Sequence, residues 1–188
     1  MRPILFPFLL VSLLALAGCG HDTSETADSS SSTNSSDAAA AMADAGPSAS
    51  LPDGFFLTES PSGAVPLSQA RDAAAPGDKI VFTGYIGGRV EPFTEGRAVF
   101  LVADAVNAPR CVPDHGCPTP WDACCVPGET VAANSASVRV VDADGHILKV
   151  GLNGRGGLAP GREVTVKGTV KEANDAVFLV DANALAVK

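Results

Sequence analysis

The clearest structural signal in this 188-residue sequence is the stretch Arg162–Lys171, which reads Arg-Glu-Val-Thr-Val-Lys-Gly-Thr-Val-Lys. Its residues alternate strictly, with three valines and Gly168 on one face and threonines and lysines on the other. A period of two with one apolar and one polar face predicts a strand that is buried on one side and solvated on the other.

Other short segments have the same β-rich composition and end at Gly, Pro, Asn or Asp residues, which predicts further strands. These predicted strands are Lys79–Ile86, Arg97–Ala103, Ser137–Val141, Ile147–Leu152 and Ala176–Asp181. The turn sequence Asp142–Gly145 predicts a hairpin between the third and fourth of them. Val65–Ala75 predicts one short helix before the first strand, ended by Pro76 and Gly77.

The number and spacing of these strands resemble the OB-fold, and the resemblance covers about residues 77–187. Gly84 and Gly168 lie in mid-strand, where a small closed barrel needs bends or close backbone approach. We therefore predict an all-β domain over residues 54–188, built as a small OB-like Greek-key barrel of five or six strands with a short N-terminal helix. A β-sandwich is the alternative.

The first eighteen residues have the features of an export signal: Arg2 followed by an apolar run over Ile4–Ala17. The run is too short for a membrane-spanning helix, which needs about 20 residues. Leu16-Ala17-Gly18-Cys19 resembles the lipobox of bacterial lipoproteins. The resemblance implies removal of residues 1–18, acylation of Cys19, palmitate included, and attachment to the cell membrane or outer membrane, with the domain facing the periplasm or the exterior. An ordinary secretory signal is the alternative.

Residues 19–53 are rich in serine and alanine, contain six acidic residues, and have few β-branched or aromatic side chains. Such a segment buries too little apolar surface to offset the entropy lost on ordering, so we predict a disordered tether. From Leu51 onward 12 Lys and Arg stand against 16 Asp and Glu, a balance of -4 within the total of -8. This charge argues against the nucleic-acid binding that some OB-folds perform.

Four of the five cysteines lie within fifteen residues, in a Cys-rich loop over 111–128 between the second and third predicted strands. They are Cys111, Cys117, Cys124 and Cys125. The motif Thr-Pro-Trp-Asp-x-Cys-Cys is similar to one in a family of uncharacterised bacterial lipoproteins, and that resemblance implies no activity. From their positions we expect Trp121 to pack over the sulfurs and Asp122 to cap or turn the loop.

Three interpretations of the loop follow from its composition. An exported protein meets an oxidising compartment, which favours two disulfides, with Cys111 and Cys117 each bonded to Cys124 or Cys125. The cysteines together with His115, and with Asp114 as a further candidate, are alternatively ligands for copper or zinc. A thiol-redox role is the third possibility, although the sequence has no Cys-x-x-Cys motif.

No catalytic constellation is recognisable elsewhere. The glycine-rich segment 153–157 is followed by a strand and not by a helix, so it does not fit a phosphate-binding loop, and we expect a mobile loop there. His146 is expected to face solvent at the hairpin turn, and no hydrolase triad can be assembled. The sequence thus predicts a lipid-anchored, non-catalytic binding or structural module without a cofactor, braced by disulfides, whose partner is an envelope protein or a small ligand. Metal handling or redox chemistry is the alternative.

Overall fold

The computed structural model describes residues 50–112 and 116–188. The predicted signal peptide, Cys19 and most of the predicted tether therefore lie outside the described residues, as do Asp114 and His115 of the cysteine loop. None of the helices in the described ranges has the length and apolar character needed to cross a membrane.

The described chain is mainly β-structure, as the sequence predicts. Its elements in chain order are β1 (Phe56–Leu57), β2 (Val65–Pro66), α1 (Leu67–Ala73), β3 (Lys79–Ile86), β4 (Val99–Ala103), the 3-10 helix η2 (Pro120–Asp122), α2 (Gly128–Ala133), β5 (Ser135–Arg139), the 3-10 helix η3 (Arg155–Gly157), β6 (Glu163–Ala173) and β7 (Phe178–Val187).

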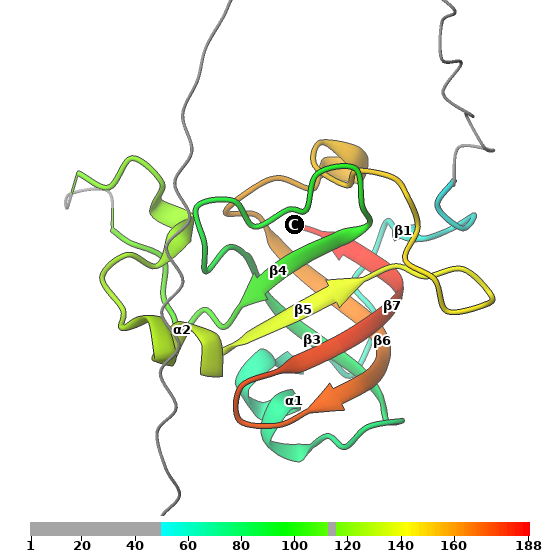
Figure 1. Cartoon of the computed structure of the whole chain (residues 1–188), viewed down its shortest axis with the longest axis horizontal. Helices are drawn as coiled ribbons and strands as arrows, with labels where there is room; N and C mark the ends of the chain where they lie inside the picture. The colour runs from blue at the N-terminus through cyan, green and yellow to red at the C-terminus, as the bar shows by residue number, and fades with distance from the viewer. Residues whose placement is uncertain (1–49, 113–115) are drawn as a thin grey trace, which may run out of the picture. The chain divides into compact units, whose positions relative to one another are not determined.

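Five strands close into a barrel in the order β3-β4-β5-β7-β6, with β6 pairing back onto β3 (Figure 1). The β5–β7 pair is parallel and the other four barrel pairs are antiparallel. The predicted OB-like barrel is confirmed. The short strands β1 and β2 extend the sheet by pairing in parallel with β7 and β3, respectively.

Strand β6 contains the alternating stretch, and its three valines are buried as predicted. Thr165 departs from the pattern because it is also fully buried, and its hydroxyl donates to the Ser60 hydroxyl at 3.3 Å. The sheet bends at Gly168, where the register with β7 shifts. A Cβ atom at Gly168 would lie 2.5 Å from the Asp181 carbonyl oxygen. The close approach of the two strands therefore requires glycine there.

The hydrophobic core has two parts. The larger cluster fills the barrel and includes Phe82, Phe100 and Phe178, while α1 closes one end of the barrel with Leu67 and Ala70 (Figure 1). The smaller cluster lies between the barrel and the cysteine loop. Its members are Tyr85, Ala103, Ala108, Ala123 and Val131, with Trp121 and Val126 packed against them. This second cluster joins the loop to the fold.

The prediction of a hairpin after β5 is wrong for its second strand, residues 147–152. The turn forms, but only an isolated bridge between Val141 and Ile147 follows it, and 147–152 is not a strand. The Leu148 backbone instead bonds in two directions, donating to the Val140 carbonyl and accepting from the Ala98 N–H. This chain segment therefore covers the barrel end with Leu148 and does not extend the sheet.

The predicted helix over residues 65–75 is shorter in the structure, where α1 spans Leu67–Ala73. Val65 and Pro66 pair with Phe82 and Thr83 of β3 instead. Proline has no backbone N–H and its fixed φ suits the residue that precedes a helix, so Pro66 marks the change from strand to helix.

Candidate functional site

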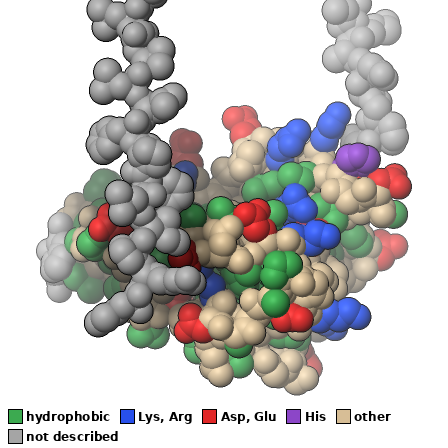
Figure 2. All heavy atoms as spheres, turned by 60° about the horizontal axis from the view of Figure 1, so that its bottom comes forward, with side chains coloured by type: hydrophobic (Ala, Val, Ile, Leu, Met, Phe, Trp, Pro, Cys, Tyr) green, Lys and Arg blue, Asp and Glu red, His purple; other side chains and the backbone are tan. Residues whose placement is uncertain are grey.

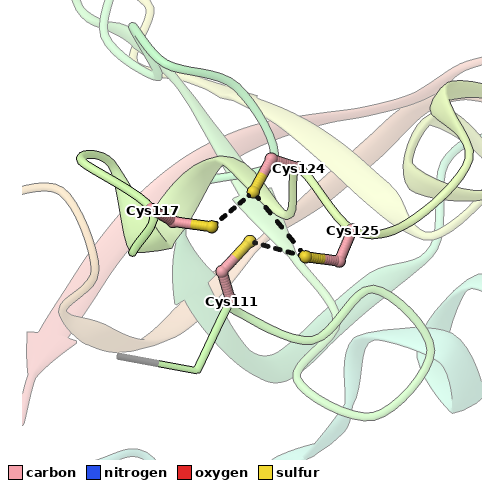
Figure 3. Close-up of side chains that lie close together, drawn as sticks. All are labelled: Cys111, Cys117, Cys124 and Cys125. Atoms are coloured by element: carbon pink, nitrogen blue, oxygen red, sulfur yellow. Dashed lines mark hydrogen bonds between the residues drawn. The ribbon is translucent and has the colours of Figure 1, made fainter. Parts of the chain in front are cut away.

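The loop between β4 and β5 brings the four cysteine sulfurs into one cluster, with all four Sγ atoms within 4.8 Å of one another. Cys117 and Cys124 are 2.8 Å apart, Cys111 and Cys125 are 3.7 Å apart, and Cys124 and Cys125 are 3.8 Å apart (Figure 3). The four side chains point toward one another (Figure 3). We call this group the four-cysteine cluster.

The start of the loop is held by a buried carboxylate. Asp104 follows β4 directly and is only 1% exposed. It accepts backbone N–H bonds from Val106 and Asn107 in its own turn and from Ser68 of α1, at 2.8–2.9 Å. Burial alone raises the pKa of Asp104, but these three donors outweigh burial and lower it below its ordinary value.

The barrel also positions Cys111. The hydroxyl of Tyr85 on β3 donates to the Ala108 carbonyl at 2.7 Å, and the guanidinium of Arg110 lies 5.3 Å from the centre of the Tyr85 ring. The Cys111 N–H then donates to the Pro120 carbonyl at 2.8 Å, which joins the two arms of the loop. Cys111 is buried as a result, with 6% exposure.

A tight turn presents the two adjacent cysteines. Asp122 accepts from the Thr119 hydroxyl at 2.7 Å and from the Cys124 N–H at 2.9 Å, which confirms the prediction that it turns the loop. Ala123 adopts the left-handed conformation, with φ of 56°, and thereby reverses the chain after η2. Trp121 packs against the smaller core cluster and its indole N–H donates to the Val90 carbonyl.

The cluster is buried on one side and open on the other. Cys117 is half-buried, whereas Cys124 and Cys125 are exposed. A cavity of about 500 Å³ opens beside Cys124, lined in part by Leu101 of β4 and Ser137 of β5. Reagents and ions in solution can therefore reach the sulfurs from this side.

The thiols of the cluster influence one another's ionisation. Hydrogen bonding with Cys124, and then with Cys117 and Cys125, lowers the pKa of Cys111 despite its burial. The pKa of Cys124 is strongly raised, first by its bond to Cys111 and then by its bond to Cys117. The bond with Cys124 lowers the pKa of Cys117, but the bond to Cys111, desolvation and the charges of Cys111 and Cys125 together outweigh it and raise the pKa. Because like charges this close repel, one proton leaves readily while others are retained.

The structure thus brings together every predicted cysteine of the loop. It contains no disulfide bond among the described residues, so the predicted pairing of Cys111 and Cys117 with Cys124 or Cys125 stays a prediction. His115 lies outside the described residues, and its role as a ligand also stays a prediction.

A second group of potential ligands, which the sequence reasoning did not select, consists of Asp142, Asp144 and His146. The Asp-x-Asp-x-His spacing was the available signal. The Asp142 carboxylate accepts the N–H groups of the other two residues, and all three are exposed. These hydrogen bonds and this exposure are those of a surface turn. The predicted exposure of His146 is confirmed.

The glycine-rich segment forms a compact turn around η3. Gly154 donates its N–H to the Leu158 carbonyl, and Leu158 donates back to Arg155. Gly156 lies against the ring of Phe56, and both Gly154 and Gly156 have positive φ. The glycines therefore serve the turn and the close packing.

No protein-family model and no curated protein matches this chain. The proposal for its function therefore depends on the four-cysteine cluster and on the fold that presents it.

Proposed function

We propose that this protein is a lipid-anchored cell-envelope protein whose cysteine loop binds one thiophilic metal ion, Zn²⁺ or Cu⁺, through Cys111, Cys117, Cys124 and Cys125. The observation that carries the proposal is the convergence of four sulfur atoms within 4.8 Å in a loop held by the barrel. Thiolate sulfur is the donor that both ions prefer in proteins.

The separations of the sulfurs support a tetrahedral site. A Zn–S bond of about 2.3 Å places neighbouring sulfurs about 3.8 Å apart at the corners of a tetrahedron. The Cys111–Cys125 and Cys124–Cys125 separations of 3.7 and 3.8 Å match this spacing. Cys117 and Cys124 are closer, at 2.8 Å, so an ion would hold these two sulfurs about 1 Å further apart.

Electrostatics also favours a cation at this position. A metal ion is bound by thiolates, and four negative charges within 4.8 Å repel one another strongly unless a cation lies between them. Asp122 orients the Cys124 end of the cluster through its bond to the Cys124 N–H. Groups that orient metal ligands in this way strengthen metal binding.

The exposure of the cluster favours metal handling over a purely structural ion. Cys124 and Cys125 face solvent, and the cavity beside Cys124 gives an ion or a second ligand a route to the site.

Acidic and basic side chains are interspersed over the described part of the face in Figure 2. We propose no catalysis, and we propose an envelope protein or a small ligand as the exchange partner.

A second candidate function is a binding or structural module braced by disulfides. The 2.8 Å separation of Cys117 and Cys124 favours it, since two sulfurs this close need only a small movement to bond. The proposed export to an oxidising compartment favours it as well.

Native mass spectrometry separates the two candidates. The full chain with Cys19→Ser, which removes the fifth cysteine, is purified with reductant and offered Zn²⁺ or Cu⁺. We expect one ion per chain, lost in the Cys111→Ser/Cys125→Ser variant and retained in His146→Ala, which alters the exposed turn. A fully reduced chain that binds neither ion contradicts metal binding. Isolation with four hydrogens missing and no ion supports the braced module.

The lipid attachment is tested separately. We expect the wild-type chain in the membrane fraction and the Cys19→Ser chain in the soluble fraction after export, because two or more acyl chains are needed for stable attachment. A Cys19→Ser chain that stays with the membrane would contradict the lipoprotein proposal.

A further inference from the structure

The contacts within the four-cysteine cluster distinguish between its possible disulfide pairings. Four cysteines can pair in three ways. The pairing of Cys117 with Cys124 and of Cys111 with Cys125 joins sulfurs that lie 2.8 Å and 3.7 Å apart, respectively. Figure 3 shows these two contacts side by side.

We infer that oxidation of the cluster forms the Cys117–Cys124 and Cys111–Cys125 disulfides and releases the bound metal ion. The pairing depends on the sulfur positions alone, while the release of metal depends also on the proposed function. The site would thus have two states, a reduced state that binds metal and an oxidised state that does not.

The 3.8 Å contact between the adjacent Cys124 and Cys125 does not compete. A bridge between neighbouring residues closes a small strained ring, and it leaves Cys111 to pair with Cys117. In this pairing each disulfide joins the two arms of the loop. Cys111 and Cys117 precede η2, whereas Cys124 and Cys125 follow the left-handed turn at Ala123.

The exposure of the cysteines determines which sulfur of each pair an external reagent reaches first. Cys124 and Cys125 are exposed, and each is paired with a more buried partner, Cys117 or Cys111. The exposed sulfur is therefore the one that an external reagent reaches first. The buried partner lies next to it and completes the bridge.

The oxidant is a small-molecule disulfide, and the reaction balances as thiol–disulfide exchange. One cysteine thiolate attacks the reagent, forms a mixed disulfide and expels one small thiolate. The partner cysteine then attacks the mixed disulfide and expels the second small thiolate. Each bridge takes two electrons from the protein and reduces one reagent disulfide to two thiols. Both bridges together consume two reagent molecules, and an ion held by four thiolates loses all its ligands.

Variants with two remaining cysteines test the pairing without any metal. In the Cys19→Ser chain, Cys117→Ser/Cys124→Ser retains the contact pair 111 and 125, and Cys111→Ser/Cys125→Ser retains 117 and 124. The matched controls are Cys111→Ser/Cys124→Ser and Cys117→Ser/Cys125→Ser, which retain the crossed pairs. Each reduced chain is exposed to oxidised glutathione, and the loss of two hydrogens is followed by mass spectrometry.

We expect both contact pairs to close several-fold faster than both crossed pairs, with circular dichroism showing that all four variants are folded. Equal rates, or faster closure of a crossed pair, would overturn the pairing. A further measurement uses the oxidised chain with all four loop cysteines, cleaved before Asp114 and Asp122. The three cysteine-containing peptides should remain linked, and release of the peptide that holds Cys124 and Cys125 would also overturn it.

The release of metal is tested on the reduced chain loaded with Zn²⁺ alone. Oxidised glutathione should release one zinc ion as two molecules of it are consumed, and reductant should restore binding. Zinc that stays bound after both bridges have formed would overturn the two-state site. If the reduced chain binds no zinc at all, the proposed function fails, while the rates of the two-cysteine variants still decide the pairing.

Discussion

The hydroxyl of Tyr85 donates a 2.7 Å hydrogen bond to the carbonyl of Ala108, and this bond joins barrel strand β3 to the arm of the loop that leads to Cys111. Tyr85 is fully buried and is the only tyrosine in the chain. Its ionisation therefore reports directly on the contact between the barrel and the cysteine loop.

Burial raises the pKa of Tyr85 from 10.0 to about 12. Because the folded-state pKa is the higher one, this group stabilises the fold fully below pH 10 and loses that contribution as the pH rises toward 12. We expect the phenolate absorbance of the native chain to develop with a midpoint near 12, against about 10 in urea. A native chain that keeps its fold and titrates near pH 10 would contradict this placement of Tyr85.

Asp104 should make the fold sensitive to acid. Its pKa is lowered by the three N–H donors in spite of burial, so its contribution to stability is present above the ordinary pKa of 3.8 and is lost as the pH falls below that value. We expect Asp104→Asn to lower the free energy of unfolding at neutral pH by about 1–3 kcal/mol and to weaken the acid dependence, both measured by urea titration. Asp53→Asn, at an exposed carboxylate, is the control and should change neither quantity.

Gly168 should not tolerate even one additional carbon atom. A Cβ there would lie 2.5 Å from the Asp181 carbonyl oxygen and 2.7 Å from Val180 Cγ1, so the two longest strands would have to separate. We expect Gly168→Ala to reduce the free energy of unfolding by about 1–3 kcal/mol. Gly128→Ala is the control, since a Cβ meets nothing within 4 Å at that helical position, and it should be neutral or slightly stabilising. Equal stability of the two variants would rule out the tight approach of β6 and β7.

Asp122 should strengthen metal binding without touching the ion. Its carboxylate accepts from the Thr119 hydroxyl and the Cys124 N–H, and so holds one ligand in place. We expect Asp122→Ala to weaken zinc binding by about 10–100-fold in competition with a chelator. Asp122→Asn retains an acceptor oxygen and should lose less. Asp72→Ala, an exposed site on α1, should bind zinc as the wild type does, and an Asp122→Ala chain with unchanged affinity would refute the orienting role.

Local pattern predicted the barrel well where one strand face is apolar and the other polar. The stretch Arg162–Lys171 is a strand of the barrel, and the mid-strand glycines at 84 and 168 lie where neighbouring strands approach closely. The same local reasoning failed over 147–152, whose composition is equally β-rich. Leu148 donates its N–H to the Val140 carbonyl and accepts from the Ala98 N–H, and the contact with the distant Ala98 leaves no periodic trace in the sequence.

The cysteine loop, too, was predictable from its sequence only in part. Four cysteines within fifteen residues are within reach of one another, so their spacing was enough to single out the loop as a candidate sulfur site. Which sulfurs touch depends on how the loop is folded, which is set by the Tyr85 hydroxyl from the barrel and by the Pro120 carbonyl and the left-handed turn at Ala123 within the loop. Spacing limits how far apart two side chains can be, whereas their orientation is set by the surfaces against which the chain packs.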